Sequence, residues 1–202
     1  MESYLTLARG WRHEGEKIKG SRFIADVAPV GSAEAAEDFV GGVRAAFPDA
    51  THHCFAYRIT EKIFRSADDG EPSGTAGRPM LQAIDGRGLV EVVAVVTRYY
   101  GRTKLGAGGL VRAYSSAAAA ALDQAGVRTV VRTQDLRVEH PYEVSGEVQS
   151  VLVALGLTPV ASEYGVTVRF TLRVPVAQAE SVVRELTERT AGRCSVAKGD
   201  AR

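Results

Sequence analysis

The chain has 202 residues, of which 45% are hydrophobic, and this is enough to build one large or two small cores without a metal or disulfide. Lysine and arginine number 25 against 24 aspartate and glutamate residues, so net charge excludes a strongly basic or acidic protein and leaves recognition to local patches. The two cysteines, Cys54 and Cys194, lie far apart, which excludes a disulfide framework and favours a reducing compartment.

The sequence also predicts where the chain resides. Residues 1–11 lack the basic region and the apolar run of a signal peptide, and no stretch approaches the roughly 18 apolar residues of a membrane span. We therefore expect a cytoplasmic chain without a membrane partner. The sequence makes no prediction of the oligomeric state.

The first half of the chain predicts strands interrupted by helices. Composition and patterning place strands at 4–11, 21–27, 52–59 and 90–96, with a polar hairpin connection after the first. Ser32 is a suitable cap for a helix that ends at Pro48. The segment 64–81 is rich in turn-forming residues and predicts a loop, which leads into a short helix containing Met80 and Ile84.

The stretch 90–114 combines a strand, a basic glycine-rich loop and the start of a helix. Val90–Val96 is almost wholly apolar, which is typical of a strand buried on both faces. The helix begins near Leu105, has Leu110, Val111, Tyr114 and Ala118 on one side, and ends at a Gly126 cap. Its first backbone N–H groups can bind an anion beside the loop cations. The candidates for this anion or nucleic-acid site are Arg98, Tyr99, Arg102, Lys104, Gly106, Gly108, Gly109 and Arg112.

The second half predicts the order strand-helix-strand-strand-helix-strand. The predicted strands cover 136–140, 158–162, 166–174 and 194–196. The helices contain Val151 and Val182, and Gly156 ends the first. This order is the ferredoxin-like plan, in which both helices cover one face of a four-stranded sheet. We expect an α+β fold, an α/β sandwich, with an N-terminal domain over 1–127 and a ferredoxin-like domain over 132–202.

Four long motifs in the first 125 residues resemble the YigZ/IMPACT family. They are K-I-K-G-S-R-F (17–23), A-T-H-H-C-F-A-Y-R (50–58), D-D-G-E-P-S-G-T-A-G-R-P (68–79) and T-R-Y-Y-G-R-T-K-L-G-A-G-G-L-V-R-A-Y (97–114). The second half resembles the smaller ferredoxin-like domain that bacterial members append. One position departs from the family pattern, because Arg102 stands where a second glycine usually follows Gly101.

The resemblance implies two domains similar in fold and order to the last two domains of elongation factor G, the first similar to its domain IV. It also implies a link to translation, because eukaryotic relatives regulate translation by binding other proteins. For bacterial members it implies no established reaction. Fold likeness alone does not fix a function, so the function has to be argued from sites.

The acidic turn in the third motif is a second candidate site. Its residues are Asp68, Asp69, Gly70, Glu71, Pro72, Ser73, Gly74 and Thr75. Clustered carboxylates suit Mg²⁺ or Ca²⁺, but their spacing is not that of a calcium loop. A shaped turn that packs against the glycine-rich loop is the preferred interpretation, and no metal is predicted. Ser73 does not sit in the Gly-x-Ser-x-Gly elbow of a serine hydrolase.

The remaining motifs do not predict an enzyme. Neighbouring side chains on a strand point to opposite faces, so His53 cannot join His52 and Cys54 at one metal ion. His52 and Cys54 share a face, but a buried cysteine beside a hydrogen-bonded histidine is commoner than a nucleophile and base. The glycine-rich loop matches neither the P-loop nor the dinucleotide fingerprint. We expect no catalytic residue and no cofactor.

Two further groups of cations are candidate nucleic-acid contacts, and the common alternative for both is a solvated charged face. The first consists of Lys17, Lys19 and Arg22, and the second, on the open face of the second sheet, of Arg137, Arg169 and Arg173. Cations near exposed tyrosines suit single-stranded RNA, because rings stack on bases and cations contact phosphates.

These patterns predict a non-enzymatic module that binds RNA or the translation machinery, so its partner is RNA, the ribosome or a translation-regulatory protein. Two alternatives stay open. One is an enzyme or binder for a phosphorylated or nucleotide ligand at the glycine-rich loop, and the other is a regulator that binds only proteins.

Overall fold

The computed structural model describes residues 3–201, which divide into two compact units. The first unit is Tyr4–Val130, and the second comprises Ser3 and the described residues from Val131 onward. Buried apolar side chains form clusters that lie wholly within one unit or the other. Each unit therefore has a hydrophobic core of its own.

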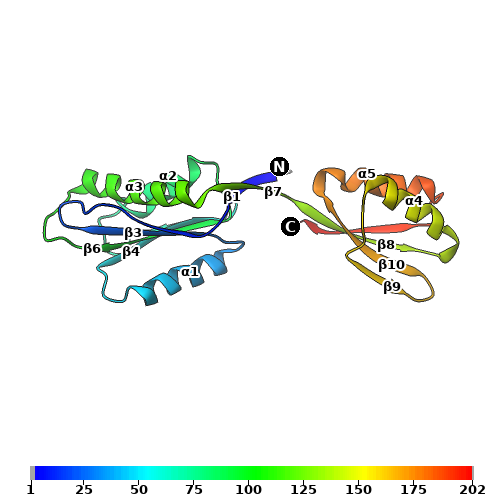
Figure 1. Ribbon diagram of the computed structural model, residues 1–202, viewed down its shortest axis with the longest axis horizontal. Helices are drawn as coiled ribbons and strands as arrows, with labels where there is room; N and C mark the ends of the chain where they lie inside the picture. Colours follow the sequence, from blue (N-terminus) through cyan, green and yellow to red (C-terminus); the bar gives the residue numbers. More distant parts are fainter. Residues whose placement is uncertain (1–2, 202) are drawn as a thin grey trace. The chain divides into compact units, whose positions relative to one another are not determined.

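The first unit is a sheet covered on both faces by helices (Figure 1). Its elements are β1 (Ser3–Leu7), β2 (Trp11–Glu14), β3 (Arg22–Pro29), α1 (Ala33–Ala46), β4 (His52–Arg58), β5 (Phe64–Ala67), α2 (Gly77–Asp85), β6 (Val92–Tyr99), α3 (Ala107–Ala125) and β7 (Val127–Val131). Five strands form an antiparallel sheet in the order β2-β3-β6-β4-β5. Helix α1 covers one face, and α2 and α3 cover the other (Figure 1). Strands β1 and β7 pair separately.

Strand β6 lies at the centre of this sheet, as its apolar sequence predicts. Val92, Ala94 and Val96 pack against α2 and α3, whereas Val93 and Val95 pack against α1. All five are fully buried. A strand with two covered faces needs no polar residue at alternate positions, which explains why its sequence shows no alternation.

The predicted helix ends are confirmed at three positions. Ser32 Oγ accepts a hydrogen bond of 3.1 Å from the Ala35 N–H at the start of α1. Gly126, with φ of +71°, follows the last residue of α3, and Gly156, with φ of +63°, ends a helix in the second unit. Among residues 3–201, no helix combines the length and the hydropathy that a membrane crossing needs.

The second unit has the ferredoxin-like order that its sequence predicts. Its elements are β8 (Thr133–His140), the 3-10 turn η1 (Tyr142–Val144), α4 (Ser145–Leu155), β9 (Ala161–Tyr164), β10 (Val168–Pro175), α5 (Val176–Arg189) and β11 (Ser195–Ala201). The strand order is β11-β8-β10-β9, and all pairs are antiparallel. Helices α4 and α5 cover the same face (Figure 1) and pack on Leu136, Val138 and Leu172.

Three parts of the chain differ from the prediction. The single strand predicted at 4–11 is two strands, because β1 pairs with β7 whereas β2 pairs with β3. The segment predicted as a loop contains β5, an exposed edge strand whose residues lack a core pattern. Val111, predicted on the buried side of α3, is exposed because the helix turns Leu110 and Tyr114 inward instead.

The separate cores predict that the second unit folds alone. We expect residues 132–202, expressed without the rest, to give a dispersed amide spectrum, because the core of this unit needs no side chain from the first. Two-dimensional NMR of the labelled fragment tests this. A collapsed spectrum, with the full chain as the dispersed reference, would refute it.

Candidate functional site

The structure brings together two of the predicted basic segments. The loop between β2 and β3 and the beginning of α3 line one cavity of about 290 Å³. Its lining residues are Ile18, Lys19, Leu105, Gly109, Arg112, Ala113 and Ser116. Lys19 and Arg112, which are far apart in the sequence, therefore flank the same hollow. Its apolar part, formed by Ile18 and Leu105, was not predicted, because neither residue carries a chemical signature.

A tight backbone turn places Lys19 beside the cavity. Lys19 and Gly20 have φ of +48° and +80°, and the backbone groups of Ile18 and Ser21 exchange hydrogen bonds of 2.9 Å across them. This is the two-residue hairpin turn that needs positive φ at both central positions. Lys19 thus sits at the tip of the turn and extends beside α3.

The glycine-rich loop passes directly against this hairpin. A Cβ atom on Gly101 would lie 1.9 Å from the Gly20 carbonyl carbon, so no other residue fits at position 101. The Gly101 N–H donates to Ser21 Oγ at 3.1 Å. The next residue, Arg102, has φ of +67°. A residue other than glycine in that backbone region costs about 1 kcal/mol.

We call five exposed cations the basic surface: Lys17, Lys19, Arg102, Lys104 and Arg112. Lys19 and Arg112 line the cavity, and the other three lie within three residues in the sequence of a residue that lines it. No aspartate or glutamate occurs between Glu91 and Asp123, so this part of the chain offers them no local counter-charge. Within residues 3–201, none of the five forms a salt bridge, although Lys17 lies near Glu14. Arg22 differs, because it pairs with Glu14 at 2.8 Å and lies over the Tyr99 ring.

The N-terminus of α3 lies next to the cavity, which Gly109 and Arg112 line. Gly106 precedes the helix with φ of +73°, and no side chain caps it. The first intrahelical bond there runs from the Leu110 N–H to the Gly106 carbonyl. The N–H groups of Ala107, Gly108 and Gly109 therefore precede the hydrogen-bond ladder and point towards the end where the cations gather.

Arg98, predicted as a loop cation, is inside the protein. Its side chain is 4% exposed and its Nη1 lies 2.5 Å from Glu71 Oε1, which is equally buried. The Tyr114 hydroxyl donates to the same carboxylate oxygen at 2.8 Å, and Arg98 Nη2 donates to Ser21 Oγ at 3.3 Å. Arg98 therefore positions the start of the loop and does not reach its surface.

The acidic turn is held by its own carboxylates. Asp68 accepts backbone N–H bonds from Gly74, Ala76 and Gly77 at 2.8 to 3.0 Å. Burial alone would raise the pKa of Asp68, but these hydrogen bonds outweigh it and lower the pKa below its usual value. Asp69 accepts from the His53 N–H at 2.7 Å. All three carboxylates of the turn thus have structural partners, and the described residues contain no cluster suited to a metal ion.

Cys54 and His52 lie on one face of β4 but do not form a pair. The Cys54 thiol donates to the Asp68 carbonyl at 3.0 Å, whereas His52 Nδ1 lies 2.8 Å from the Asp69 carbonyl oxygen. Burial raises the pKa of the Cys54 thiol to about 12, so the thiol stays protonated at neutral pH. A protonated, buried thiol is not a nucleophile.

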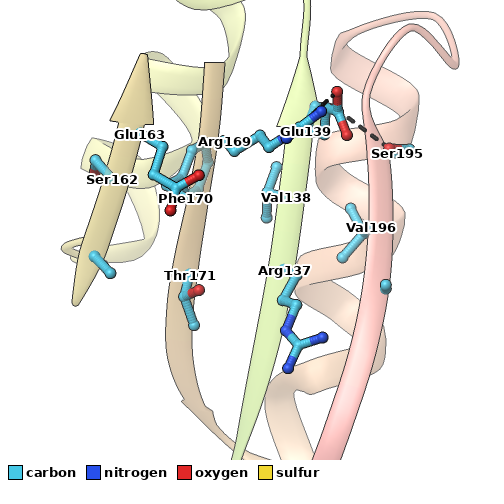
Figure 2. Close-up of a pocket in the computed structure, with 12 residues that line it drawn as sticks. Arg137, Val138, Glu139, Ser162, Glu163, Arg169, Phe170, Thr171, Ser195 and Val196 are labelled. Atoms are coloured by element: carbon cyan, nitrogen blue, oxygen red, sulfur yellow. Dashed lines mark hydrogen bonds and ion pairs between the residues drawn. The ribbon is translucent and has the colours of Figure 1, made fainter. Parts of the chain in front are cut away.

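The second predicted patch is electrically balanced. Arg169 pairs with Glu139 at 3.2 Å and Arg173 with Asp135 at 2.8 Å, as cross-strand neighbours on the open face of the second sheet. Arg137 has no such pair within residues 3–201 and lines a shallow cavity of about 510 Å³ on that face (Figure 2). This face therefore lacks the excess positive charge of the basic surface.

Comparison with known proteins covers nearly the whole chain. Residues 19–122 match the family model described as Impact N-terminal domain, and residues 138–193 match Domain of unknown function (DUF1949). The IMPACT family member YvyE of Bacillus subtilis is 35% identical over 99% of this chain and 93% of its own. The IMPACT family member in the pol 5′ region of Thermus thermophilus is 41% identical over 87% of this chain and 97% of its own.

Two further comparisons agree with these. The IMPACT family member YigZ of Escherichia coli is 36% identical over 88% of this chain and 89% of its own. A solved structure titled as the crystal structure of an hypothetical protein has a TM-score of 0.73 at 35% identity. The structural match covers 97% of this chain and 97% of the solved one.

The buried ion pair predicts a large loss of stability in Glu71→Gln. This change leaves Arg98 charged and buried without its counter-ion, so we expect the free energy of unfolding to fall by about 3 to 5 kcal/mol. Urea unfolding followed by the fluorescence of Trp11, the only tryptophan, reports on the first unit. The control is Glu14→Gln, which breaks an exposed pair and should cost at most about 1 kcal/mol. Equal losses would contradict a structural role for the buried pair.

The raised pKa of Cys54 predicts an unreactive thiol. In a Cys194→Ser variant at pH 8, we expect iodoacetamide to alkylate Cys54 at least about 1000-fold more slowly than free cysteine, because the thiolate is the reactive form. The rate should rise with pH up to about 12 and become normal in urea. Rapid, stoichiometric labelling of the native protein at pH 8 would show that the thiol is activated.

Proposed function

Since the chain belongs to the IMPACT family, we propose that it is a non-enzymatic cytoplasmic module of translation that binds single-stranded RNA through the basic surface. The observation that carries this proposal is the set of five exposed cations of the basic surface, which form no salt bridge in the described residues and of which Lys19 and Arg112 line one cavity. Most other arginines of the first unit are held by carboxylates, for example Arg12, Arg65 and Arg87. Cations left free at one place are available to an anionic ligand.

The chemistry of the basic surface suits a nucleic-acid backbone. Arg102 and Arg112 are bidentate donors for phosphate, and Lys19 and Lys104 add mobile charge. The uncapped N–H groups at the beginning of α3 favour one phosphate there. Tyr100 is 45% exposed next to the loop and offers a ring on which a base can stack.

We propose no catalytic role for the chain, because the candidate chemical groups of the first unit have structural partners or are unreactive. Glu71 and Asp68 are tied to buried partners, and the Cys54 thiol is protonated. A small phosphorylated ligand that enters the cavity of about 290 Å³ is the alternative at the same surface. The two kinds of ligand differ in length: an RNA strand would contact cations outside the cavity, whereas a small phosphorylated ligand would not.

Removing loop cations should weaken RNA binding and its salt dependence. We expect Arg102→Ala with Lys104→Ala to lower the affinity for a mixed-sequence single-stranded RNA. The slope of log affinity against log salt should become shallower by about one to two units, because roughly 0.7 counterions are released for each phosphate contacted. Fluorescence anisotropy at several salt concentrations measures both quantities.

The matched control is Lys62→Ala with Arg128→Ala. It removes the same charge from exposed positions of the first unit that lie outside the basic surface, and it should leave the slope unchanged. Equal slopes for all three proteins, or no binding below about 100 μM at low salt, would reject the RNA proposal. Binding of a mononucleotide as tightly as RNA would favour the small-ligand alternative.

A further inference from the structure

The outermost strand of the second unit has a free edge. Strand β9 pairs only with β10, and all four of its residues are exposed. The Gly165 N–H bonds to the Thr167 carbonyl at 3.0 Å and closes the hairpin between the two strands. Hydrogen-bonded pairs alternate along an antiparallel ladder, so Glu163 and Ala161 direct their backbone groups to β10. The backbone groups of Ser162 and Tyr164 therefore point away from the sheet.

An apolar cavity lies beside this edge on the helix side of the sheet. It has a volume of about 520 Å³, between β9 and the first turns of α4. Its apolar part comes from Val148, Leu152, Val168 and Phe170. Ser162 and Tyr164 line it too, so the residues with free backbone groups also border the cavity. Tyr142 and Tyr164 stand at its rim with 51% and 76% of their surface exposed.

The other side of β9 presents a single free carboxylate. Glu163 lies opposite Arg169, but Arg169 forms its ion pair with Glu139, and no cation within residues 3–201 pairs with Glu163 (Figure 2). Directly opposite side chains on neighbouring strands are close enough to interact, and opposite charges there stabilise the pairing. A basic residue opposite Glu163 would therefore stabilise the pairing of a strand added at this edge.

A second copy of the chain is a poor occupant of this edge. If two copies paired antiparallel along the full length of β9, the outward backbone groups of Ser162 in one copy would form hydrogen bonds with those of Tyr164 in the other. That register sets the two Glu163 carboxylates directly opposite each other, and like charges at such a position are destabilising. The charge on β9 thus selects against self-association and for a basic partner.

We propose that β9 binds an extended peptide segment of another protein as a fifth strand of the sheet. The segment carries apolar residues opposite Ser162 and Tyr164, where they enter the cavity, and a lysine or arginine between them opposite Glu163. Backbone hydrogen bonds supply affinity in this mode of recognition, and the alternating side chains supply selectivity. This site lies in the second unit and is independent of the RNA proposal.

Peptides that differ in one charge test the proposal. The probe is a capped pentapeptide, Thr-Val-Lys-Val-Thr, added to the ¹⁵N-labelled full chain and compared with Thr-Val-Glu-Val-Thr. We expect amide shifts and slower hydrogen exchange at Ser162 and Tyr164, and about two- to fivefold tighter binding of the lysine peptide. In Glu163→Lys the preference should reverse. The proposal would be overturned if no amide of β9 shifted at peptide concentrations up to about 1 mM, because the dissociation constant would then be too high for peptide recognition. Equal binding of the two peptides would overturn it as well.

A backbone variant separates strand pairing from contact with the cavity alone. Ser162→Pro removes the outward N–H, and an edge strand tolerates proline at such a position. It should abolish binding while the amide spectrum away from β9 stays unchanged, whereas Ser162→Ala should bind normally. Undiminished binding to the proline variant would overturn the proposal. So would concentration-dependent dimerisation at β9 in place of peptide binding.

Discussion

The ion pair between Glu71 and Arg98 is the constraint on which the first unit depends. A guanidinium buried without a counter-ion costs several kcal/mol, so Arg98 fixes the position of every group around it. Arg98 contacts the acidic turn through Glu71 and the end of the β2–β3 hairpin through Ser21. The Tyr114 hydroxyl of α3 donates to the same Glu71 carboxylate. Of these segments, the β2–β3 connection and α3 also line the cavity beside the basic surface.

This constraint explains the structural role of the residues in the conspicuous motifs. Asp68 holds the three N–H groups that lead into α2, and Gly77 must lack a side chain because a Cβ atom would lie 2.6 Å from the Ala67 nitrogen. Gly101 is needed for the contact with Gly20. The residues that resemble a metal or nucleophile site therefore stabilise a turn. We propose a function for the exposed cations of the basic surface, which have no such structural partner within the described residues.

The sequence predicted what depends on local pattern and missed what depends on long-range pairing. The doubly buried β6, the Ser32 cap and the ferredoxin-like order follow from apolar spacing and turn chemistry. Arg98 was predicted as a loop cation because its neighbours in sequence are basic, and nothing local identifies Glu71 as its partner. The meeting of Lys19 with Arg112 likewise depends on how two distant turns pack, which composition and periodicity do not encode.

The cations of the two candidate surfaces differ in their salt bridges, and this difference leads us to propose different partners for the two units. Cations of the basic surface form no salt bridge in the described residues, so the proposed binding of an anionic polymer would depend on an electrostatic attraction that salt screens. On the second sheet, Arg169 and Arg173 are neutralised within the open face, where Arg137 and Glu163 form no salt bridge within the described residues. The free edge of β9 borders an apolar cavity on the other face. Backbone pairing and apolar burial depend little on salt. The two proposed sites share no residue, so the proposed RNA and peptide ligands do not compete for the same side chains.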